Sequence, residues 1–349
     1  MVTREDVIWC YSTFLNRAPE SNEVVEEWRK RCRDFRDLAR AFQESTEHQN
    51  LIIARSNSVP AHDPAEPAQG WIPYVPRPPF LRPATSEFLP FSMCVADDFM
   101  HPRFMEICDA IKHRFQFHRK LWEWVFVIHH LLKSGAVKKG ARGLVFGVGA
   151  ERLPAYFASL GASIVATDAP EEIGEANGWK ATGQHSAELN ALLHRDLIDE
   201  SEFRARVSYE QCDMNHIPDH LTGFDFNWSS CCFEHLGDLE AGMDFVVNAV
   251  EKTLRIGGVA VHTTELNMSS DDETLASGHT VIYRHRDLKN LVERLRSRGH
   301  EVEELRVSPG SHPLDFHVDM PPYRHDPHIK LMYDRFVTTS VGIVVRRGA

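Results

Sequence analysis

Two glycines and an aspartate occupy positions where a chain can bind a nucleoside. Gly147 and Gly149 follow an apolar run, GLVF, and precede a helical stretch, and the next apolar run, SIVATD, ends on Asp168. Glycines at a strand-to-helix turn let the backbone approach a ligand closely, and an acid at the tip of the next strand can accept hydrogen bonds from ribose hydroxyls. The spacing predicts a site for a nucleoside-containing cofactor.

The same turn argues against a nicotinamide dinucleotide. The dinucleotide fingerprint needs a third glycine three positions after Gly149, but that position is Arg152, with Ala150 and Glu151 in between. Oxidoreductase chemistry is therefore disfavoured.

Polar residues also end the next two apolar runs. RVSYEQC leads to Asp213-Met214, where a carboxylate can accept from an adenine amino group and an apolar side chain can pack on the ring. FDFNW leads to Ser229-Ser230, followed closely by Glu234-His235.

The elements that must position these residues alternate from residue 143 onward. The runs GLVFG, SIVATD, RVSYEQCD, FDFNWSS and GGVAVHTTE predict strands separated by helices, which indicates a parallel sheet covered on both faces. EVEELRV and FVTTSVGIVVR predict two more strands around a Pro- and His-rich insertion at 308–330. We expect an α/β, Rossmann-like sheet of seven strands, closed by a long antiparallel edge strand.

Other segments precede this domain, which we place at 141–349. A helical module at 1–55 is indicated by a helix after Ser21 and by two apolar faces, Val7, Ile8, Tyr11, Phe14 and Leu15, then Phe35, Leu38, Ala39 and Phe42. A Pro-rich linker is expected at 56–100, because residues 56–90 hold nine of the 19 prolines. A helical lead-in at 101–140 carries a stripe of Leu121, Val125, Ile128 and Leu132.

The ordered motifs resemble those of class I S-adenosylmethionine-dependent methyltransferases. The resemblance covers residues 141–349 and comprises the G-x-G turn, Asp168, Asp213-Met214, the run Ser-Ser-x-x-x-Glu-His-Leu from Ser229, and the turn LRIGG. HRKLWEW, GWKATGQH, HTTELN and DMPPYRHDPHIKL also resemble a bacterial subfamily linked to glycan or secondary-metabolite assembly. YSTFLNRAPES and AFQESTEHQ resemble a phycobilisome-linker-like helical repeat; a generic helical bundle is the alternative.

The methyltransferase resemblance implies a role for each motif. S-adenosylmethionine would bind with its methionine portion along Gly147 and Gly149, and its product would be S-adenosylhomocysteine. The other contacts implied are Asp168 for the ribose, Asp213 and Met214 for the adenine, Ser229 or Ser230 beside the sulfonium, Arg119, Lys120 and Trp122 as a cover, and Gln184 and His185 from a loop. For the cover and the loop, an amphipathic helix with a solvated basic edge and a surface loop remain the alternatives.

Methyl transfer to a sugar or other hydroxyl requires removal of a proton, which makes His235 the first candidate base. Glu234 can orient it, and Glu265 with His262 are the alternative pair. Some methyltransferases of this kind place Glu-x-x-Glu-His around a divalent metal. Cys231 stands at the first position here, so a metal is not favoured.

Other functions stay open at this point. The acceptor can instead be a nitrogen or carboxylate of a small molecule, or the domain can be a noncatalytic scaffold that assembles as a homo-oligomer through its N-terminal helices. The net charge of -11 disfavours nucleic acid as a partner. Seven cysteines without a C-x-x-C pair, and no apolar run long enough for a membrane span, indicate a cytoplasmic protein. The resemblance implies a small-molecule or glycan acceptor as its partner.

Overall fold

The described part of the chain forms two compact units. The computed structural model describes residues 2–15, 17–50, 87–170, 189–308, 310–324 and 326–349. One unit lies within Met1–Trp71 and the other within Ile72–Ala349. Gln184, His185 and residues 56–86 of the expected linker lie outside the described residues.

The first unit is a small helical bundle. Its helices are α1 (Arg4–Cys10), which continues as a π-helical turn, η1 (Tyr11–Leu15), then α2 (Asn22–Arg31) and α3 (Phe35–Gln43). Thr3, Ser21 and Asp34 cap α1, α2 and α3 by accepting from backbone amides in the first turn. The predicted apolar faces meet in a core, although Ile8 is 40% exposed.

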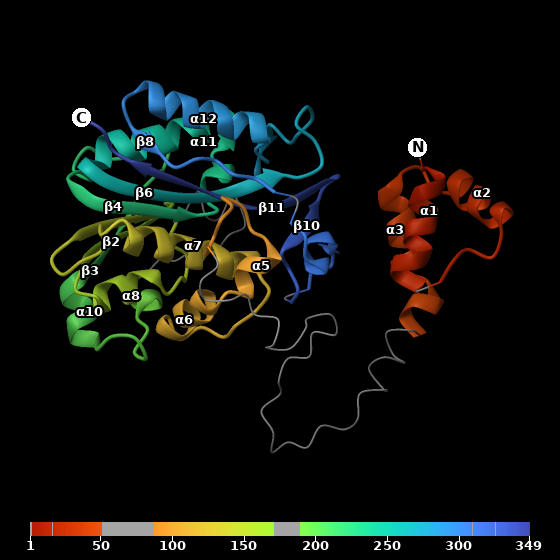
Figure 1. Ribbon diagram of the computed structural model, residues 1–349, viewed down its shortest axis with the longest axis horizontal. Coiled ribbons are helices and arrows are strands. Elements are labelled where there is room, and N and C mark those ends of the chain that lie inside the picture. Colours follow the sequence, from red (N-terminus) through yellow and green to blue (C-terminus); the bar gives the residue numbers. More distant parts are fainter. Residues whose placement is uncertain (1, 16, 51–86, 171–188, 309, 325) are drawn as a thin grey trace, which may run out of the picture. The chain divides into compact units, whose positions relative to one another are not determined.

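The second unit is built on a nine-stranded sheet, counted over the described residues (Figure 1). Five parallel strands run in the order β3-β2-β1-β4-β6, and β11 follows, antiparallel to β6. Their bounds are β1 (Arg142–Phe146), β2 (Ser163–Asp168), β3 (Val207–Gln211), β4 (Phe224–Ser230), β6 (Leu254–Asn267) and β11 (Phe336–Arg346). The α/β class and the antiparallel last strand are as the sequence predicts.

The last strand is not an edge, and here the prediction was wrong. β11 pairs at one end with β10 (Lys330–Tyr333), which pairs with β9 (Val318–Asp319), and at the other with β8 (Glu301–Val302). Between them, Met93 bridges Val341, and the amide of Cys94 donates to the carbonyl of Ser340. A long strand at an edge would leave many backbone N–H and C=O groups without partners, and here several short segments pair with the outer side of β11.

Helices cover both faces of the sheet (Figure 1). One face carries α7 (Arg119–Lys133), α8 (Leu153–Ser159) and α10 (Glu200–Arg206), together with α5 (Ala96–Phe99) and α6 (Pro102–Ala110). The other carries α11 (Leu239–Asn248) and α12 (His285–Ser297). Residues 89–100 of the expected linker and α7 of the expected lead-in are integral to this unit, since Leu89, Met93, Phe99, Leu121 and Val125 are buried in its cores.

Side chains alternate between the two cores along each strand. On β6, Val259 and Val261 join the core beneath α7, and Ala260 joins the core beneath α11. The remaining short elements are η3 (Leu189–Leu192), η4 (Phe233–His235), β5 (Gly237–Asp238), η5 (Ala249–Thr253), β7 (Ser277–Gly278) and η6 (Pro313–Phe316). None of the helices in the described ranges has the length and apolar character to cross a membrane.

Candidate functional site

The glycine turn brings three strand ends together. Gly147 and Gly149 follow β1 with φ angles of 61° and 50°, in the left-handed region that favours glycine. A Cβ on Gly147 would lie 2.6 Å from the sulfur of Cys232, which follows β4, and 3.9 Å from the sulfur of Met214, which follows β3. A side chain at Gly147 would therefore fill the space between these strand ends.

Asp168 is fixed against this turn. Its carboxylate is 4% exposed, and it accepts from the amide of Gly149 at 3.0 Å and from the amide of Ala169 at 2.8 Å. Carboxylate oxygens have further lone pairs, so a donor on a ligand can be added to these two bonds. The turn and the acid thus form one unit, and the contact of Asp168 with a ribose remains a prediction.

Asp213 and Met214 lie at the end of β3. Met214 is 8% exposed and faces the turn, where an apolar side chain can contact a flat ring. The Asp213 carboxylate accepts from the amide of Asn215 and lies 2.8 Å from Nδ1 of His216. Its contact with adenine remains a prediction.

A buried group of charges lies where α7 begins. The Glu123 carboxylate is fully buried; it accepts from Lys120 Nζ at 2.8 Å, from Cys231 Sγ at 3.0 Å and from Ser340 Oγ at 2.6 Å. Burial raises the pKa of Glu123, but the charges of Lys120 and Arg119 outweigh it and bring that pKa to about 2. Arg119 also forms an ion pair with Glu265. Arg119 and Lys120 are thus held at the site.

Trp122 does not cover the site. Its side chain is fully buried, and its indole donates to Asp98 at 2.8 Å. Lys120 and Glu123 are three positions apart and share one face of α7, whereas Trp122 points to another face. The expectation of an aromatic cover is corrected by this helical geometry.

Ser229 and His262 also lie away from the site. They are register partners on β4 and β6, both fully buried, and Ser229 Oγ lies 2.8 Å from Nδ1 of His262. The His262 ring packs against Phe245 at 5.5 Å between centroids, and burial lowers its pKa to about 3. A base must reach its substrate, so this side chain belongs to the core beneath α11. Ser230, which points the opposite way, remains beside the site.

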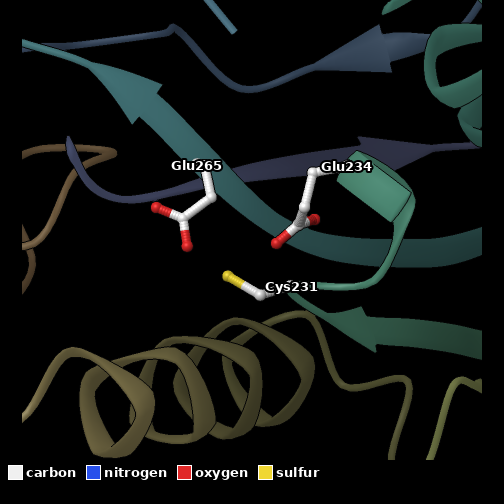
Figure 2. Close-up of side chains that lie close together, drawn as sticks. All are labelled: Cys231, Glu234 and Glu265. Carbon is white, nitrogen blue, oxygen red and sulfur yellow. The ribbon is translucent and has the colours of Figure 1, made fainter. Parts of the chain in front are cut away.

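Cys231, Glu234 and Glu265 converge at the ends of β4 and β6. Figure 2 shows the two carboxylates and the thiol pointing toward one another, and one donor atom from each lies within 4.8 Å of the others. Glu234 accepts from Thr264 Oγ1 at 3.1 Å, and Glu265 accepts from Thr338 Oγ1 at 2.9 Å. Burial and the nearby charge of Glu265 raise the pKa of Glu234 well above its usual range.

The same three groups could hold a metal only by displacing existing partners. Arg119 already neutralises Glu265, and burial raises the pKa of the Cys231 thiol well above its usual range, so that it donates to Glu123. Magnesium and calcium take oxygen ligands and do not favour sulfur. The donor set does not fit such an ion, and no chemical step is assigned to a metal.

His235 lies beside this group in η4. Its Nδ1 is 2.8 Å from the carbonyl oxygen of His279, so Nδ1 carries the proton and Nε2 is the basic nitrogen of the neutral ring. Burial lowers the pKa of His235, which keeps the ring neutral at pH 7. The tautomer suits a base that acts through Nε2.

The insertion packs against the start of α7. His328 exchanges backbone hydrogen bonds with Phe117 and Arg119, and its ring lies 4.7 Å from the ring of His118. Asp319 lies 2.5 Å from Nδ1 of His328. The Pro- and His-rich insertion is therefore anchored next to the buried charges.

Glu151 is a site residue that the sequence reasoning missed. It lies in the glycine turn and is 5% exposed, and it accepts from Trp228 Nε1 at 2.7 Å. Burial raises its pKa to about 7. The signal was present in the sequence, because an acidic side chain follows Gly149 by two residues within the turn itself.

No family model matches the chain, and no curated protein matches it. Solved structures of similar fold include S-adenosylmethionine-dependent methyltransferases. The methyltransferase domain of bacterial CtHen1 is 16% identical, with 63% of this chain and 95% of that chain covered and a TM-score of 0.38. A methyltransferase from Clostridium acetobutylicum is 13% identical (71% and 98% covered, TM-score 0.38), and the [4+2]-cyclase SpnF is 14% identical (64% and 81% covered, TM-score 0.41). At these identities the likeness concerns the fold alone.

Proposed function

We propose that this protein is an S-adenosylmethionine-dependent methyltransferase that methylates a hydroxyl group of a small-molecule or glycan acceptor. The observation that carries the proposal is the fixed unit of Asp168 and the glycine turn at the ends of β1 and β2. A buried carboxylate tied to such a turn suits a nucleoside. The sequence resemblance to class I methyltransferases selects the cofactor.

The residues present fit this cofactor. Asp168 would hold the ribose and Met214 would contact the adenine, and glycine is required at 147 because a Cβ there would clash with Cys232. When bound, the cofactor supplies an electrophilic methyl group on a sulfonium. The protein's own task is then to place an acceptor oxygen in line with that methyl group.

The acceptor side of the site can position a hydroxyl and take its proton. Glu234 and Glu265 offer buried carboxylate oxygens that accept hydrogen bonds from a polyol. His235, neutral and fixed in one tautomer, would take the proton of the hydroxyl through Nε2. The glycan class of acceptor rests on the resemblance of the four shorter segments.

The experiment is a screen of sugar and phenol acceptors with S-adenosylmethionine carrying a labelled methyl group. With any accepted hydroxyl, we expect His235→Gln to lower kcat by roughly 10²- to 10⁴-fold and to leave S-adenosylhomocysteine binding unchanged. An unchanged kcat would remove His235 as the base.

Two alternatives predict other outcomes of this screen. A noncatalytic scaffold binds no cofactor and forms oligomers through the first unit. An enzyme acting on nitrogen or carboxylate acceptors transfers label to amines or acids but not to hydroxyls.

A further inference from the structure

We propose that Glu151 and Lys120 together recognise the amino-acid end of the cofactor, with Glu151 binding its ammonium group and Lys120 its carboxylate. This inference rests on the proposed function and goes beyond it by assigning one residue to each charged group of the amino acid. The ligand chemistry is a zwitterion, carrying one positive and one negative group on the same carbon.

The position of Glu151 supports this assignment. It stands two residues after Gly149, and its carboxylate meets the indole of Trp228, two residues before Ser230 at the end of β4. Burial raises the pKa of the Cys232 thiol, and the charge of Glu151 is among those that raise it further. This thiol lies 2.6 Å from where a Cβ on Gly147 would stand. The carboxylate therefore lies at the cofactor turn.

Burial raises the pKa of Glu151 to about 7, and the part of it that is ionised at neutral pH has no ion-pair partner within the described residues. Glu123 and Glu265 each form ion pairs with basic side chains, whereas Glu151 forms no ion pair within the described residues. Burying an ionised carboxylate without a cation is costly, and such groups concentrate at binding sites. Strand β1 (RGLVF) carries no acidic residue, and Glu151 is the first carboxylate after it in the sequence.

The hydrogen bond to Trp228 does not explain the charge. A glutamine would accept from the same indole without the cost of burying a charge, so the hydrogen bond to Trp228 does not by itself require a carboxylate. A ligand ammonium would need one, because charge-assisted hydrogen bonds are the stronger kind.

Lys120 is placed for the opposite charge. Its ammonium donates to the carbonyl of Ser230 at 2.8 Å, beside the same end of β4, and it is close enough to Glu151 to lower its pKa. The side chain is 40% exposed although Glu123 holds it, so a ligand carboxylate can reach the third hydrogen of its ammonium.

The test compares two ligands that differ only in this end. Calorimetry on the full chain measures binding of S-adenosylhomocysteine and of 5′-methylthioadenosine, which lacks the amino-acid group. We expect Glu151→Gln to weaken S-adenosylhomocysteine by roughly 10- to 100-fold and to leave 5′-methylthioadenosine within about twofold. Lys120→Gln should show the same selectivity, and the exposed Glu240→Gln should change neither ligand.

Three results would overturn the inference. Glu151→Gln and Lys120→Gln that bind S-adenosylhomocysteine like the wild type would exclude the charge pair. Equally weakened binding of both ligands would mean that the two residues shape the turn and do not bind the amino-acid group. Binding of neither ligand by the folded wild type would overturn the proposed function together with the inference. The first two results overturn the inference alone, so the two failures can be told apart.

Discussion

Buried carboxylates at one site can have opposite acidities when their partners differ. Glu123 forms ion pairs with Arg119 and Lys120 and has a pKa of about 2, whereas Glu151 forms no ion pair within the described residues and has a pKa of about 7. Burial raises the pKa of both, and the nearby charges decide the outcome. At neutral pH Glu123 is fully charged, and about half of Glu151 holds a proton.

This difference predicts how stability depends on pH. The pKa of Glu151 is raised by folding, so its contribution to stability is present below about pH 4.5 and is lost as the pH rises to about 7, a change of about 3 kcal/mol. The groups that face it are Lys120 and Glu123 on α7, Ser230 and Trp228 on β4, and Cys232. Urea unfolding at pH 5 and pH 7.5 should show a smaller fall for Glu151→Gln than for the wild type, and parallel falls would contradict this.

Glu123 should matter more for stability than a surface acid does. Glu123→Gln removes the buried carboxylate that pairs with both Lys120 and Arg119. Because breaking a buried ion pair leaves a charge without compensation, we expect the free energy of unfolding to fall by about 3 kcal/mol. The matched control is Glu106→Gln, which breaks the exposed pair with Arg103 and should cost below about 1 kcal/mol. Equal losses in urea unfolding would refute the account of this group.

At the residue scale, the sequence identifies positions at strand ends but not the directions of side chains. Asp168 and the glycines are predictable because a strand end fixes their place. Ser229 and Ser230 are adjacent, and only the register of β4 decides which of them faces the site. The burial of Glu151 has no local signal, because it depends on the packing of the turn against Trp228 of β4.

At the scale of elements, α7 packs closely against β11 at Gly342, which has no side chain. A Cβ on Gly342 of β11 would lie 2.1 Å from the ring of Phe126 on α7. We expect Gly342→Ala to lower the free energy of unfolding by about 2 kcal/mol, because the ring must move. Phe126→Leu should recover part of that loss in the double variant, and additive losses would contradict direct packing.

The same strand explains why the sequence predicted its place only in part. The run FVTTSVGIVVR marks β11 with correct bounds, because eleven mostly apolar residues suit a buried strand. Its outer neighbours are short: β8 begins the run EVEELRV, which predicts a strand, whereas the residues near 93 and 330 have no strand pattern. Such contacts between distant segments have no local signal.

At the scale of the whole molecule, the two units have separate hydrophobic cores. A fragment of residues 87–349 should therefore bind S-adenosylhomocysteine with an affinity within about twofold of the full chain, since all described candidate contacts lie in the second unit. Calorimetry on both proteins checks this. A large loss in the folded fragment would mean that residues 1–86 contribute to the site.

The central claim is that Asp168 and the glycine turn bind S-adenosylmethionine. Its most direct test is calorimetric titration of S-adenosylmethionine and S-adenosylhomocysteine into the full chain and into Asp168→Asn, with NADH as the control ligand. We predict binding of both sulfur ligands by the wild type, weakening of at least about tenfold in the variant, and no binding of NADH. A folded wild type that binds neither sulfur ligand, or that binds NADH alone, would contradict the account.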